Sequence, residues 1–84
     1  MVYDVMNNFD HYAAAQDLIS CLSKEGYQSD AALLQSVLDD GCTGTEILMG
    51  LRFYLSEIVL RTPMKTETND QAYRLLAELN KALE

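Results

Sequence analysis

Residues 43–61 read TGTEILMGLRFYLSEIVLR, and this stretch decides the fold. Thr43 and Glu46 match a capping box, in which the hydroxyl and the carboxylate each bond the other residue's backbone N–H. A largely apolar run follows as far as Leu60 and contains Ile47, Leu48, Leu51, Tyr54, Leu55, Ile58 and Val59. These residues cover more than half of a helix circumference, which indicates a helix that lies at the centre of a bundle or packs on two neighbours. Gly50 within it predicts a close helix crossing.

Two amphipathic segments precede this helix. The first runs from Asp4 to Lys24, with an apolar stripe at three- and four-residue spacing made of Val5, Phe9, Tyr12, Ala15, Ile19 and Leu22. Gly26 predicts its stop, because glycine adopts the left-handed conformation without strain. The second segment runs over 30–40, with Ser29 as its N-cap. Gly41 ends it, and its inward face consists of Ala31, Leu34, Val37 and Leu38.

A fourth helix is predicted after the only proline, Pro63. Residues 63–67 read as a loop, and Thr68-Asn69-Asp70-Gln71 matches a second capping box. The helix then runs to Leu83, with a stripe made of Ala72, Leu75, Leu76, Leu79 and Leu83. Short turns favour antiparallel packing of consecutive helices. We therefore predict an all-α fold, a compact single-domain bundle of about four antiparallel helices spanning residues 1–84.

The composition is that of one small globular domain with a lopsided charge. Of the 84 residues, 49% are hydrophobic and 23% are charged, and the net charge is −7. The first 42 residues carry seven acids and one base, so nearly all of the excess lies in that half. An acidic protein is repelled by nucleic-acid phosphates and is attracted to basic partners. We expect no direct nucleic-acid binding, but binding to a protein that itself binds nucleic acid.

The cysteines and the hydropathy pattern predict a cytoplasmic protein. Cys21 and Cys42 lack the close spacing of a zinc or redox motif and are too few for a disulfide framework. No signal-peptide pattern begins the chain, and Arg52 and Glu57 interrupt the longest apolar segment. We expect two reduced thiols and no membrane span.

No catalytic or metal-binding pattern stands out. His11 is the only histidine, and it lies near no recognisable nucleophile motif. Asp39, Asp40 and Cys42 lie close together but match no metal-ligand spacing. The glycine-containing helix entrance at 41–45 lacks the lysine of a phosphate-binding loop, so we interpret it as a turn with a cap. The sequence therefore predicts no enzyme activity, no cofactor and no metal.

A protein-binding surface is the better hypothesis. Tyrosine is enriched at interfaces because it combines a large contact area with a polar end. Tyr27 lies next to a turn, where burial and exposure are equally open, whereas Tyr54 is expected in the core. The candidate partner-binding residues are Tyr27 and five acids of the first two segments: Asp10, Asp17, Asp30, Asp39 and Asp40. The alternative is that these acids only form solvated faces.

The stretch GCTGTEILMGLRFYL at 41–55 resembles small helical immunity proteins of bacterial polymorphic toxin systems, of the MafI-like and contact-dependent growth inhibition type. Gly26-Tyr27 and the amphipathic helix after it extend the resemblance, which covers Gly26 to Leu55. It implies a protein that binds and neutralises a cognate toxin domain, often a nuclease such as an RNase, and performs no chemistry itself. It assigns no binding residues, because the shared motif is mostly cap and core.

Two other functions are also consistent with the sequence. The apolar segment over 43–60 is also consistent with a homodimeric regulatory or assembly module that has no toxin partner, because a small bundle can leave part of it uncovered. The third hypothesis is a small enzyme subunit. For an immunity protein, the acids would either imitate nucleic acid in the toxin's active site or bind beside that site, and strong salt dependence would favour an electrostatic mode.

Overall fold

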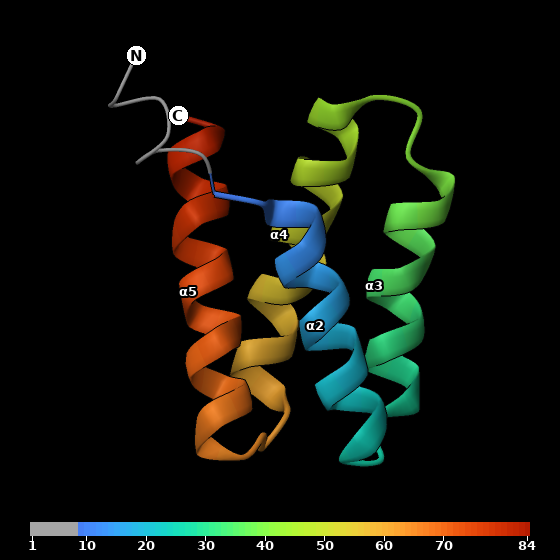
Figure 1. Ribbon diagram of the computed structural model, residues 1–84, viewed down its shortest axis with the longest axis vertical. Helices are drawn as coiled ribbons and strands as arrows, with labels where there is room; N and C mark the ends of the chain where they lie inside the picture. The colour runs from blue at the N-terminus through green and yellow to red at the C-terminus, as the bar shows by residue number, and fades with distance from the viewer. Residues whose placement is uncertain (1–8) are drawn as a thin grey trace.

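Four helices make up most of the part of the chain that the structure describes, residues 9–84 of a computed structural model (Figure 1). They are α2 (His11–Lys24), α3 (Gln28–Asp40), α4 (Gly44–Arg61) and α5 (Thr66–Ala82). Consecutive helices run in opposite directions, and α2 also packs on α5, so the four helices form a closed ring. The predicted all-α bundle of four antiparallel helices is thus confirmed. In the described part of the chain, no helix is long and apolar enough to cross a membrane.

Helix α4 begins where the sequence predicted. Thr43 is its N-cap, and the Thr43 hydroxyl accepts a hydrogen bond from the Glu46 N–H at 3.1 Å. Within residues 9–84, no bond returns from the Thr43 N–H to the Glu46 carboxylate, so only half of the capping box forms and Glu46 stays exposed. The helix packs on both α3 and α5, which is the predicted arrangement with two neighbouring helices.

Glycine ends α2 and α3 for different reasons. Gly26 has a φ of 92°, and the Gly26 and Tyr27 N–H groups bond the carbonyls of Ser23 and Leu22, which is a Schellman motif. Gly41 has ordinary extended backbone, but a Cβ there would lie 2.3 Å from Cγ1 of Ile47. The first glycine supplies a left-handed residue, and the second allows the α3–α4 connection to pass close to α4.

Two predicted helix starts are wrong. Helix α2 begins at His11 and not at Asp4, because Asp10 is extended and its carboxylate accepts the Ala13 N–H at 3.0 Å as an N-cap. Predicted residues 4–8, including Val5, lie outside the described part. Helix α3 begins at Gln28 after Tyr27, so Ser29 lies within the helix and does not cap it.

The second predicted capping box is also wrong. Helix α5 begins at Thr66, inside the predicted loop. Thr68 is buried in its first turn, and its hydroxyl bonds the Glu25 carboxylate from the α2–α3 connection. The Thr68 side chain, which the local pattern predicted to be a cap, therefore makes a tertiary hydrogen bond to Glu25 instead.

The core lies along the axis of the bundle. Its buried apolar residues are Ala15, Leu18, Leu22, Ala31, Leu34, Leu38, Leu51, Leu55, Ile58, Ala72, Leu75 and Leu79. Leu18 replaces Tyr12 in the predicted stripe of α2, and the Tyr12 side chain is exposed. Tyr54, expected in the core, is partly buried against it. At Gly50, a Cβ would lie 2.9 Å from Cγ1 of Val37, which confirms the predicted close helix crossing.

Candidate partner-binding surface

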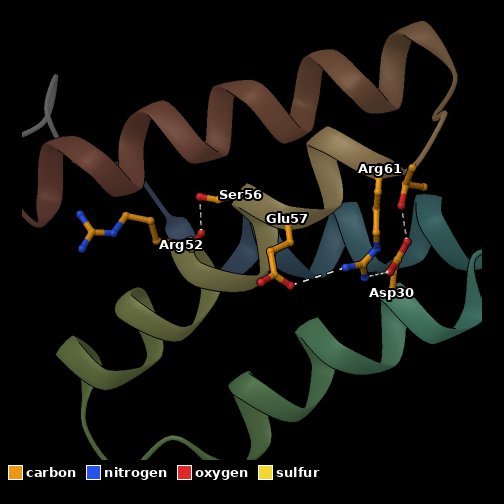
Figure 2. Close-up of polar contacts among 6 residues, drawn as sticks. Asp30, Arg52, Ser56, Glu57 and Arg61 are labelled. Carbon is orange, nitrogen blue, oxygen red and sulfur yellow. Dashed lines mark hydrogen bonds and ion pairs between the residues drawn. The ribbon is translucent and has the colours of Figure 1, made fainter.

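Asp30 holds α3 to the end of α4 (Figure 2). Its carboxylate accepts one bond from the Arg61 guanidinium and one from the Thr62 hydroxyl, each at 2.6 Å. Asp30 and Thr62 are both buried. The bond to Asp30 raises the pKa of Arg61 above its ordinary value. This arrangement assigns Asp30 to the interior of the fold, and we leave it out of the partner-binding surface that the sequence suggested.

The neighbouring connections are tied together by further polar contacts. The Tyr27 hydroxyl donates to the Pro63 carbonyl at 2.9 Å, and its side chain is half-buried. The Glu25 carboxylate accepts the Lys65 N–H at 2.9 Å and the Thr68 hydroxyl, which together lower the pKa of Glu25. These bonds join the α2–α3 connection to the α4–α5 connection. Tyr27 is therefore a structural contact at this end of the bundle.

The opposite end of the bundle carries exposed acids, and we call Asp10, Asp39, Asp40 and Glu46 the acidic end. Asp10 precedes α2, Asp39 and Asp40 close α3, and Glu46 lies in the first turn of α4, which the antiparallel order brings to one end. Residues 25–51 contain five acids and no lysine or arginine. Two of the five, Glu25 and Asp30, bond within the fold, so the three at the acidic end dominate the charge that this stretch presents.

Glu46 was missed by the sequence reasoning because it was taken as half of a capping box. The sequence does not show that the Glu46 carboxylate is exposed, or that the bond from the Thr43 N–H to this carboxylate does not form. Asp39 makes a bond only along its own helix, where it accepts from the Gln35 amide at 3.0 Å. The helix dipole disfavours negative charge at the C-terminal end of a helix, where Asp39 and Asp40 lie. Asp39 and Asp40 therefore do not stabilise α3 electrostatically.

An apolar hollow opens at the acidic end, between the start of α2 and the first turns of α4. Its lining residues are Phe9, Asp10, His11, Tyr12, Gly44, Ile47, Leu48 and Leu51. His11 is held in place, because its Nε2 donates to the Glu78 carbonyl at 3.2 Å and its ring packs edge-on against Phe9. Tyr12 is 45% exposed. The hollow can therefore receive an apolar side chain of a partner, with carboxylates at its rim.

No family model, no curated protein and no solved structure matches this chain.

Asp17 and the cysteines lie apart from the acidic end. Asp17 is exposed in the middle of α2 and faces α5, beside a hollow that Gln71 and Arg74 also line. Cys21, near the end of α2, is partly buried, whereas Cys42 is exposed in the α3–α4 connection, and both are free thiols. No group of three or more metal-ligating side chains gathers within residues 9–84. Of the six predicted site residues, the structure brings only Asp10, Asp39 and Asp40 to one end.

Proposed function

We propose that this chain is an immunity protein, which binds and neutralises a cognate toxin domain in the cytoplasm of the bacterium that makes it. The toxin is a basic nuclease, of the RNase class. The observation that carries the proposal is the separation of the acids. Glu25 and Asp30, at one end, bond residues of other segments, whereas Asp10, Asp39, Asp40 and Glu46, at the other end, are exposed and bond at most within their own helix.

This distribution suits a nuclease as the partner. A nuclease presents a basic surface because its substrate is a polyanion, and an exposed acidic surface accelerates association with it. The apolar hollow adds a site for one anchoring side chain beside the charges. Hot spots of this kind carry most of the binding energy in many protein interfaces. Electrostatic attraction would then set the association rate, and the anchor would set the lifetime of the complex.

The stretch that resembles immunity proteins helps to build this surface. Residues 41–55 form the α3–α4 connection and the first two thirds of α4. Gly41 lets the connection approach Ile47, and Leu51 and Leu55 are core residues. Glu46 is the exposed acid of the stretch. The resemblance thus supports the fold and one part of the acidic end.

The test is co-expression and pull-down with the protein encoded immediately upstream. We expect a stable complex that removes the growth toxicity of that protein. Asp39→Lys/Asp40→Lys should lower the affinity at least tenfold, since each charge reversal at an interface replaces an attraction by a repulsion. The matched control is Asp17→Lys/Asp70→Lys, which changes the net charge equally away from the acidic end.

The control separates a local surface from a general charge effect. Lysines at the end of α3 are favoured by the helix dipole, so unfolding should not cause the loss. Equal losses in both double variants would contradict binding at the acidic end. A neighbour that is neither toxic nor bound would contradict the immunity function.

A second function is favoured by a different observation. Met49, Phe53 and Leu60 on α4 are 52%, 60% and 85% exposed. So large an apolar area on one helix is typical of an interaction surface. It favours a homodimeric regulatory or assembly module without a toxin partner. Dimerisation and immunity are compatible, so the toxin experiment decides between these functions and the oligomeric state does not.

A further inference from the structure

Helix α4 has two apolar faces, and only one of them is in the core. Leu51, Leu55 and Ile58 point inward. On the opposite side lie Met49, Phe53, Ser56 and Leu60, which we call the α4 seam. Their spacing of four, three and four residues is the a/d spacing of a coiled coil, with Phe53 and Leu60 at a and Met49 and Ser56 at d. Neither the core nor the acidic end uses this seam.

The seam is flanked by opposite charges on its two sides. Arg52 occupies a g position and Glu57 an e position. Within residues 9–84, Arg52 makes no ion pair, and Figure 2 shows its side chain extended away from Glu57. Glu57 contacts Arg61 of its own helix at 3.5 Å, with both side chains half-exposed. One cation and one anion beside the seam are therefore positioned for a partner.

These two charges complement each other when the helix meets a copy of itself in parallel. In a parallel coiled coil, a g residue faces the e residue five positions further along the partner helix. Arg52 of each copy then faces Glu57 of the other, and the two-fold axis makes the pair twice. In an antiparallel pair, g faces g, and Arg52 would face Arg52. The sequence pattern therefore selects a second copy in the parallel orientation.

A hollow on the surface has the lining that this packing requires. Met49, Arg52, Phe53 and Ser56 line it, together with Glu57 and Asn80. In a parallel coiled coil, a knob at position a enters a hole formed by the preceding d and g residues, the facing a residue and the following d residue. For Phe53 these four are Met49, Arg52, Phe53 and Ser56 of the second copy. The small Ser56 leaves room for the ring.

The net charge also favours this face over α3. Helix α4 contains two acids and two bases, whereas α3 contains three acids and no base. Two chains that each carry −7 approach with less repulsion through a helix of zero net charge than through α3. A basic nuclease would gain little electrostatically at the α4 seam, because Arg52 and Glu57 beside it have opposite charges.

We infer that two copies of this chain associate in parallel through the α4 seam, with Arg52 of each paired to Glu57 of the other. One short seam buries less than a standard interface, so we expect a dissociation constant on the order of 10 µM. The inference does not depend on a toxin, because it concerns the chain alone.

Sedimentation velocity over a concentration series tests the association. We expect a monomer–dimer equilibrium for the wild type. Phe53→Lys should raise the dissociation constant at least tenfold, because it places a charge at the centre of the seam. Tyr73→Lys is the matched control, since Tyr73 is 48% exposed on α5, outside the seam, and should leave the equilibrium unchanged. Circular dichroism checks that both variants are folded. A wild type that stays monomeric up to millimolar concentration would overturn the inference.

Charge exchange and cross-linking test the orientation. Arg52→Glu and Glu57→Arg should each weaken the dimer several-fold, and the double exchange should restore it to within about twofold. In a Cys21→Ser/Cys42→Ser background, Met49→Cys should form a disulfide between copies when oxidised glutathione is added as the oxidant, because d faces d in the parallel arrangement. A double exchange that stays as weak as the single variants, or no cross-link at residue 49, would overturn the parallel pairing.

Discussion

Replacing Asp30 with alanine tests whether this acid belongs to the fold or to a binding surface. The variant removes both acceptors of the contact with Arg61 and Thr62. Thr62 is only 9% exposed, so its hydroxyl would lose its partner in a place that water reaches poorly. Arg61 is half-exposed and would regain water.

The size of the effect follows from these exposures. A hydrogen bond to a charged group contributes about 1.5–3 kcal/mol. We assign that range to the buried bond from Thr62 and little to the exposed, screened pair with Arg61. The expected loss in the free energy of unfolding is therefore about 1.5–3 kcal/mol. A domain of this length has a total of roughly 4–13 kcal/mol, and its midpoint temperature should fall by about 10–20 °C.

Urea and thermal unfolding followed by circular dichroism measure the loss. Asp39→Ala is the matched control, because Asp39 is exposed and should change stability by less than about 0.5 kcal/mol. Thr62→Val and the double variant complete a cycle in which the two single effects should not add. If Asp30→Ala unfolds like the wild type but no longer binds the toxin, our assignment of Asp30 to the interior is refuted.

Two further predictions concern stability. The Thr68 and Lys65 bonds lower the pKa of Glu25 from its ordinary 4.5, so their stabilisation is complete above that pH and lost as the pH falls through the lower value of the folded state. The urea midpoint should therefore drop more steeply below pH 4.5 in the wild type than in Thr68→Val, and parallel curves would contradict this. Gly50→Ala should not give the usual gain of about 1 kcal/mol, because its Cβ meets Val37, but it should give that gain in a Val37→Ala background. Equal effects in both backgrounds, measured by urea unfolding, would show that the α3–α4 crossing is looser.

The fold could be predicted from the sequence because its helices are long and periodic. The stripes of α4 and α5, the stop at Gly26 and the close approach at Gly50 are local patterns with one physical meaning each. The errors lie at helix starts, where local and tertiary bonds compete. Thr68 matched the pattern of an N-cap, but its hydroxyl donates a hydrogen bond to Glu25 from a distant segment. Only the packed structure decides such a competition.

The candidate site was harder to predict because exposure and pairing are not local properties. Asp30 and Asp39 belong to the same helix, yet one is buried against Thr62 and the other is exposed. Their position along α3 decides this, since the start of α3 lies beside the end of α4, where Arg61 is available. The sequence did indicate an exposed part of the apolar helix, but not which residues form the α4 seam.

The two proposals have a joint geometric consequence. A two-fold axis parallel to α4 places the acidic ends of both copies at the same end of the dimer, because every helix end keeps its direction along that axis. Each dimer would then present two groups of carboxylates side by side. These groups repel each other, and the contacts of the α4 seam would hold the two copies together against that repulsion. Binding of a basic toxin would neutralise that repulsion, so toxin and dimer should stabilise each other. A basic partner at the acidic end should thus lower the dissociation constant of the dimer, and added salt should reduce this coupling. An antiparallel dimer would separate the two acidic ends and would show no such coupling.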